Sequence, residues 1–107
     1  MAEKSRRRLL LERSLAEDPG DLFLQYGLAM QCLSEGDTAE GRERLIALIA
    51  AHPDSQVAAY QQLGQSYADE AMVEEARAVL TEGIKRAFAA GDAHAAGEMR
   101  GILEGLD

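Results

Sequence analysis

The fold is decided by the stretch Leu63-Gly64-Gln65-Ser66-Tyr67, which repeats in altered form a stretch 35 residues earlier, Leu28-Ala29-Met30-Gln31-Cys32. The same shift brings Ala76-Arg77-Ala78-Val79-Leu80 over Gly41-Arg42-Glu43-Arg44-Leu45. A period in the thirties, filled with helix-forming residues, indicates a stacked array of helical hairpins. Such arrays typically work by presenting a surface, so the repeat bears on function as well as on fold.

The composition favours helix over sheet. The 107 residues are 47% hydrophobic, enough for a core, while prolines number only two and aromatic residues make up 5%. A chain of this length suits one domain, and the scarcity of aromatic residues and proline disfavours strands and breaks in helices. No apolar run approaches the length of a membrane span.

The beginning of the chain and its single cysteine favour the cytoplasm. In the stretch Met1–Arg13, only Leu9-Leu10-Leu11 follows the basic residues before Glu12. That run is too short for the apolar region of a signal peptide. Cys32 has no second cysteine to pair with inside the chain, which fits a reducing compartment.

The charge is unevenly distributed. Residues 1–13 hold five basic and two acidic side chains, a net of +3, whereas residues 14–107 hold six basic and seventeen acidic ones, a net of −11. A body this acidic repels nucleic acid and anionic membranes, so neither is expected as a partner. The run Arg6-Arg7-Arg8 could contact nucleic acid, but without neighbouring aromatic residues we interpret it as a charged face that balances the acidic body.

Helix-start and helix-stop residues predict six helices with short antiparallel connections. Asp18 is expected to cap the second helix with Pro19 at its first position, and Asp54 or Ser55 to start the fourth. The expected ranges are about 3–17, 20–34, 38 to just before Pro53, 54–69, 73–90 and 93–106.

The repeated residues resemble the tetratricopeptide repeat (TPR), whose signature is W-x2-L-G-x2-Y, then A-x3-F, then P. Leu63, Gly64 and Tyr67 match its first half and Ala76 its second, whereas the earlier unit matches more loosely. The unit that begins near Leu22 has Gln25 instead of the signature tryptophan, and the next unit has Phe88 where the closing proline would fall.

The resemblance implies an all-α fold, a right-handed superhelical stack of antiparallel helix pairs. It divides 1–107, as a single TPR-like domain, into a packing helix at 1–18, repeats at 20–53 and 54–90, and a capping helix at 92–107. Small residues at Ala29, Gly41, Gly64 and Ala76 should let paired helices approach closely, with leucines at 28, 45, 63 and 80 filling the space between.

No catalytic or metal-binding pattern is present in the sequence. His52 and His94 are 42 residues apart, and no cysteine pair or H-x-x-x-H spacing accompanies them. Cys32 falls at a core position, so we interpret it as an inert buried thiol. We expect no enzyme activity, no cofactor and no metal.

The resemblance also implies where a partner binds. In a TPR, the first helix of each unit lines a concave face, and its residues at positions 2, 5, 9 and 12 point into that face. The large apolar residues fall at one end of this face, the amides in the middle and one arginine at the far end. This pattern lacks the lysines and asparagines with which some TPR domains bind chaperone tails. The expected partner-binding residues are Phe23, Tyr26, Met30, Leu33, Gln61, Gln65 and Arg100.

Two interpretations of the apolar helix 22–33 remain open. It is either an exposed groove, which binds a peptide, a partner helix or a second copy of the chain, or ordinary core covered by the first helix. The first interpretation predicts a non-catalytic protein–protein interaction module. The alternative function is a structural or assembly protein whose apolar groove mediates homodimerisation.

Overall fold

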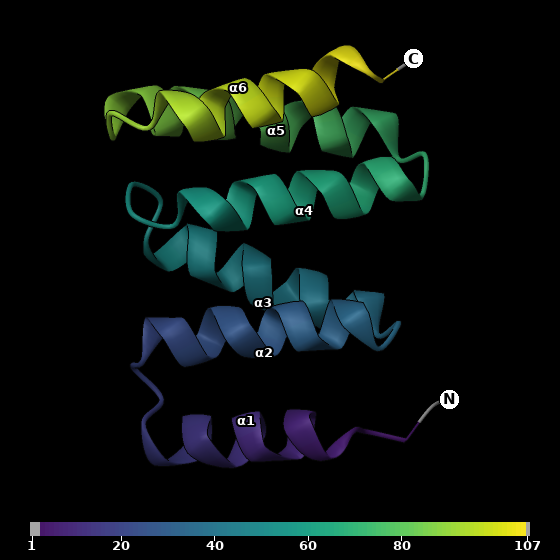
Figure 1. Ribbon diagram of the computed structural model, residues 1–107, viewed down its shortest axis with the longest axis vertical. Helices are drawn as coiled ribbons and strands as arrows, with labels where there is room; N and C mark the ends of the chain where they lie inside the picture. Colours follow the sequence, from purple (N-terminus) through teal and green to yellow (C-terminus); the bar gives the residue numbers. More distant parts are fainter. Residues whose placement is uncertain (1–2, 107) are drawn as a thin grey trace. The chain divides into compact units, whose positions relative to one another are not determined.

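The structure, a computed structural model, describes residues 3–106 (Figure 1). In this range the chain forms helices and turns and no strand, which confirms the predicted all-α fold. The six helices are α1 (Arg6–Glu17), α2 (Leu22–Ser34), α3 (Thr38–Ala51), α4 (Val57–Asp69), α5 (Val73–Ala89) and α6 (Ala93–Glu104).

The chain divides into two compact units, residues 1–48 and 49–107. The first contains α1, α2 and most of α3, with α1 packed against α2. The second contains the end of α3 and the helices α4, α5 and α6, in which α5 contacts both other helices and α6 also reaches α4. The organisation as one domain of two repeats stays a prediction.

In the first unit, α2 and α3 approach each other closely at Gly41. A Cβ atom added to Gly41 would lie 2.6 Å from Cδ2 of Leu33 and 3.2 Å from the carbonyl oxygen of Ala29. Only a residue without a side chain fits so close to a neighbouring helix. The buried apolar residues of this unit are Leu28, Ala29 and Cys32 of α2 and Leu45 and Leu48 of α3.

The first unit also holds a buried cation, Arg8, only 4% exposed. Its Nη2 donates to Asp37 Oδ2 at 2.9 Å and to Glu40 Oε1 at 2.8 Å, so α1 is tied to the turn between α2 and α3. Ser5 caps α1 by accepting a hydrogen bond from the Arg8 amide, and its hydroxyl donates to Glu35 in the same turn. The three arginines therefore do not form one charged face, because Arg8 is buried whereas Arg6 and Arg7 are exposed.

The carboxyl groups around Arg8 have pKa values below their ordinary range. The hydrogen bond from Arg8 is the chief cause for Asp37, the one from Arg44 for Glu40, and the one from Ser5 for Glu35. A carboxyl whose pKa is lower in the folded than in the unfolded chain stabilises the fold above its unfolded pKa. That contribution is lost as the pH falls through the folded-state pKa.

We expect Arg8→Met to lower the free energy of unfolding by about 1–3 kcal/mol at neutral pH, because Asp37 and its neighbours lose the cation that they face. These carboxylates are partly exposed, so the loss stays below that of a fully buried pair. As the pH falls through the lowered pKa values of these carboxyls, they become protonated and the difference from the wild type should shrink. Urea denaturation at neutral and acidic pH measures both; an equal difference at the two pH values would contradict this role for Arg8.

The second unit is built around two glycines at which helices cross. A Cβ atom on Gly64 of α4 would lie 2.4 Å from Cδ2 of Leu80 on α5. One on Gly83 of α5 would lie 2.6 Å from the Met99 sulfur on α6 and 2.7 Å from Cβ of Tyr60 on α4. These contacts confirm that Gly64 stands at a close crossing. The core buried around them consists of Tyr60, Ala76, Leu80, Ala87, Ala96 and Met99.

Two predicted helix starts are wrong. Asp18 ends α1, its amide donating to the Ser14 carbonyl, and Asp21 caps α2 by accepting from the Leu24 amide at 3.0 Å. Pro19 and Gly20 form the turn between these two caps. At the fourth helix, Asp54 instead pairs with Arg86 at 2.6 Å, and α4 begins at Val57 without a side-chain cap.

Candidate functional site

The candidate site in the first unit is the side of α2 that faces away from its buried residues. Phe23, Tyr26 and Met30 follow one another at helical spacing, on the opposite side from Leu28 and Cys32. Phe23 is 84% exposed, and Tyr26 and Met30 are partly buried. This side of α2 therefore presents large apolar groups that reach solvent; we call Phe23, Tyr26 and Met30 the α2 face.

Leu33 is the fourth predicted residue on this helix, and it is placed differently. Its side chain lies against Gly41, where α2 and α3 meet, and it is partly buried. Leu33 thus contributes to the packing of the hairpin. Its contact with a partner stays a prediction.

In the second unit, the predicted residues lie on α4 and α6. Gln61 and Gln65 are partly buried on the side of α4 away from its core residues, and the Gln65 amide donates to Asp69 Oδ1 at 2.7 Å. Arg100 is exposed on α6, with its guanidinium carbon 5.7 Å from the centre of the Phe88 ring. A cation at this distance is attracted to the face of the ring.

The same count of positions fails for one residue of α6. In the last helix, positions 2, 5, 9 and 12 are Ala93, Ala96, Arg100 and Leu103, yet Ala96 is fully buried in the core of the second unit. The sequence pattern predicts no role for Phe88, an exposed aromatic residue that lies beside Arg100. The signal available for Phe88 was its position, where the repeat signature has a closing proline.

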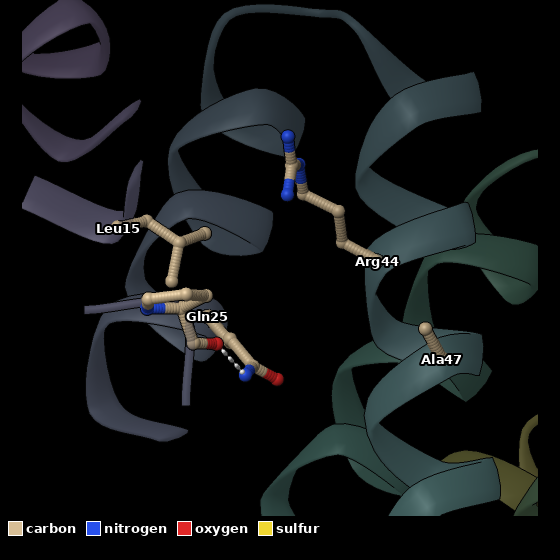
Figure 2. Close-up of a pocket in the computed structure, with 5 residues that line it drawn as sticks. Leu15, Gln25, Arg44 and Ala47 are labelled. Atoms are coloured by element: carbon tan, nitrogen blue, oxygen red, sulfur yellow. Dashed lines mark hydrogen bonds between the residues drawn. The ribbon is translucent and has the colours of Figure 1, made fainter. Parts of the chain in front are cut away.

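A hollow of about 240 Å³ lies in the first unit (Figure 2). Gln25 of α2 points toward it and donates its side-chain amide to the Pro19 carbonyl at 2.7 Å, while Arg44 on α3 gives its Nε–H to Glu40. Gln25 stands at the position where the TPR signature has tryptophan. The lining residues are Leu15, Pro19, Gln25, Arg44 and Ala47.

Among residues 3–106, His, Cys, Asp and Glu side chains form no group of three or more that could hold a metal ion. In the same part of the chain, no helix is both long and apolar enough to cross a membrane. Burial raises the pKa of Cys32 to about 11, so this side chain is a protonated thiol at neutral pH.

Comparison with known proteins adds to this geometry. No family model matches the sequence, and no curated protein sequence matches it. The structure is similar to the solution NMR structure of a tetratricopeptide repeat domain protein from Salinibacter ruber, with a TM-score of 0.78 and 24% sequence identity. The similarity covers 84% of this chain and 90% of that chain. The chain therefore has a TPR-like fold.

Proposed function

We propose that this protein is a non-catalytic protein–protein interaction module that binds a peptide or a partner helix through the α2 face. The observation that carries the proposal is the exposure of Phe23 on the same side of α2 as Tyr26 and Met30. A phenylalanine with most of its surface in water gains free energy when a partner covers it. Aromatic residues and methionine are also enriched where proteins bind one another.

The α2 face suits an apolar segment of a partner. Methionine is flexible and adapts to irregular apolar surfaces, and tyrosine combines a large ring with a hydroxyl group. The TPR-like fold supports the proposal, since helical repeat arrays commonly present such a surface to other proteins.

We propose separately that polar residues of the second unit contact a partner. The amides of Gln61 and Gln65 can each donate and accept hydrogen bonds, although Gln65 would have to share or release Asp69. The exposed guanidinium of Arg100 favours an acidic group.

A binding experiment tests the α2 face. We expect Phe23→Ala and Tyr26→Ala each to weaken the binding of a peptide selected against the wild-type protein by roughly 1–3 kcal/mol, as is typical of aromatic contacts at an interface. Phe23→Ala should leave stability unchanged because the ring is mostly exposed, and Tyr26→Ala should lower it modestly. Titration calorimetry beside urea denaturation measures the two quantities on the same variants.

Ile46→Ala is the matched control, because it removes another exposed apolar side chain of the first unit, on α3. It should leave binding unchanged. If Tyr26→Ala instead lost several kcal/mol of stability, with binding unchanged beyond that loss, Tyr26 would be a core residue. The alternative, homodimerisation through the α2 face, predicts a stable dimer in light scattering that Phe23→Ala converts to monomer.

A further inference from the structure

Packing within the chain does not explain why large apolar residues lie on the exposed side of α1. Leu9 and Leu10 are 51% and 53% exposed, although the buried Arg8 lies beside them in sequence. Arg6 and Arg13, which are exposed, stand on the same side of the helix, one turn before and one turn after the leucines. Neither arginine has an ion pair among the described residues. We call Arg6, Leu9, Leu10 and Arg13 the α1 face.

The outward side of α6 is complementary to it. Gly97 and Gly101 stand one turn apart inside the helix, both exposed, with nothing within 4 Å of the position that a Cβ atom would take. Glycine inside a helix is destabilising, and here no close packing in the chain compensates for it. Glu98 and Glu104 are exposed beside the two glycines, and Glu98 also contacts His94 at 3.0 Å. We call Gly97, Glu98, Gly101 and Glu104 the α6 face.

We propose that the α1 face of one copy of this chain docks on the α6 face of a second copy. The two leucines cover the bare backbone at the two glycines, and the arginines on the α1 face meet the glutamates on the α6 face. Charge complementarity favours a second copy of this chain as the partner, since the residues from 14 onward carry a net charge of −11 and α1 carries three exposed arginines. An acidic surface and a basic apolar surface of the same chain attract each other between copies.

The spacing of the charged groups supports the same pairing. Arg6 and Arg13 are seven residues apart, about 10.5 Å along the helix, and Glu98 and Glu104 are six apart, about 9 Å, at a rise of 1.5 Å per residue. Two helices in contact can therefore bring both pairs of opposite charges together. Glycines on one helix allow the other helix to approach closely, which shortens the contacts between the flanking charges.

The contact is head-to-tail, because each copy contributes a different face. A contact of this kind leaves one unused face of each sort on every dimer, so copies add in a chain or close into a ring. The inference concerns surfaces other than the α2 face and stands independently of the proposed partner binding. Phe23→Ala should leave this association unchanged.

Two variants, each with one face blocked, provide the test. Leu10→Glu blocks the α1 face with a negative charge at an exposed position, and Gly101→Lys blocks the α6 face with a bulky cation where space is open. Gly101→Lys gains helix propensity and Leu10→Glu leaves it nearly unchanged, so circular dichroism should show folded proteins with melting temperatures close to or above that of the wild type. Ala39→Glu on α3 and Ala78→Lys on α5 add the same charges at exposed sites elsewhere.

Sedimentation equilibrium over a range of concentrations measures the average mass of each protein. For the wild type and both control variants, we expect the average mass to rise roughly twofold or more with concentration, because a head-to-tail contact adds copies without a fixed limit. Raising the salt concentration from about 0.1 to about 1 M should weaken the association, since the screening length falls from about 10 to about 3 Å. Leu10→Glu and Gly101→Lys should each remain monomeric alone.

The decisive sample is an equimolar mixture of the two blocked variants. Each retains the face that the other lacks, so the mixture should form a one-to-one dimer that grows no further. A wild type that stays monomeric at every concentration overturns the proposal. So does association that survives in either blocked variant alone, since it would use a different surface, and a mixture that stays monomeric.

Discussion

We expect Gly64→Leu to lower the free energy of unfolding by about 3 kcal/mol, near the upper end of the range for overpacked cores. A Cβ atom at Gly64 would lie 2.4 Å from Cδ2 and 2.6 Å from Cγ of Leu80, well inside van der Waals contact. Leu80 is fully buried, so it has no open space into which it can turn. The helix α5 would have to move away from α4, and the core that both helices share would open.

Helix propensity acts in the opposite direction at this site, since replacing glycine inside an exposed helix gains up to about 1 kcal/mol. Gly97→Leu on α6, melted at a concentration at which the wild type is monomeric, is the matched control: no atom lies within 4 Å of its Cβ position, so only the propensity gain remains. Thermal melts followed by circular dichroism compare the two variants. A higher melting temperature for Gly64→Leu would show that the crossing of α4 and α5 is looser than these distances indicate.

The positions at which the helices pack could be predicted because they repeat. A period of 35 residues places Gly41 and Ala76 at equivalent points, and the leucines at 45 and 80 four residues further on. All four are buried. Once the helices are known, sequence spacing alone determines where a small residue contacts a large one. A single sequence was therefore sufficient to predict these contacts.

Arg8 could not be placed in the same way, because its partners are distant in the sequence. Asp37 and Glu40 follow it by 29 and 32 residues, and they lie at a turn whose contact with α1 no periodicity describes. One local signal did exist. Arg8 shares a helical face with Leu11 and Leu15, both partly buried, so an arginine on the inward side of α1 required a partner.

The candidate site was predicted less completely than the core. Position counting found the exposed Phe23, but it also assigned the buried Ala96 to the groove. Counting treats each helix as equivalent, whereas α6 contacts both α4 and α5 and its Ala96 lies in the core that these helices share. The exposure of a residue depends on which neighbours cover it, and that information is not contained in the period.

Removal of α6 is expected to have the largest effect of all. A chain that ends after Gly91 loses Met99, which is fully buried with its sulfur at Gly83, and Ala96 beside it. Burial of a methionine side chain alone contributes about 1.5–3 kcal/mol, and the partly buried Ile102 and Leu103 add to it. The total loss, about 3–5 kcal/mol or more, is a large part of the stability of a small protein.

The truncated chain should therefore lose its cooperative unfolding transition or aggregate, because Val79 and Ile84 lose the apolar neighbours that partly bury them. Met99→Ala tests the same contact in the intact chain. Replacing a buried methionine with alanine typically lowers the free energy of unfolding by about 2–5 kcal/mol. Lys85→Ala, at an exposed position on α5, is the control and should change stability little. If the truncated chain stayed in solution and melted as sharply as the intact one, α4 and α5 would form a stable core without α6, and the burial of Met99 would contribute little to folding.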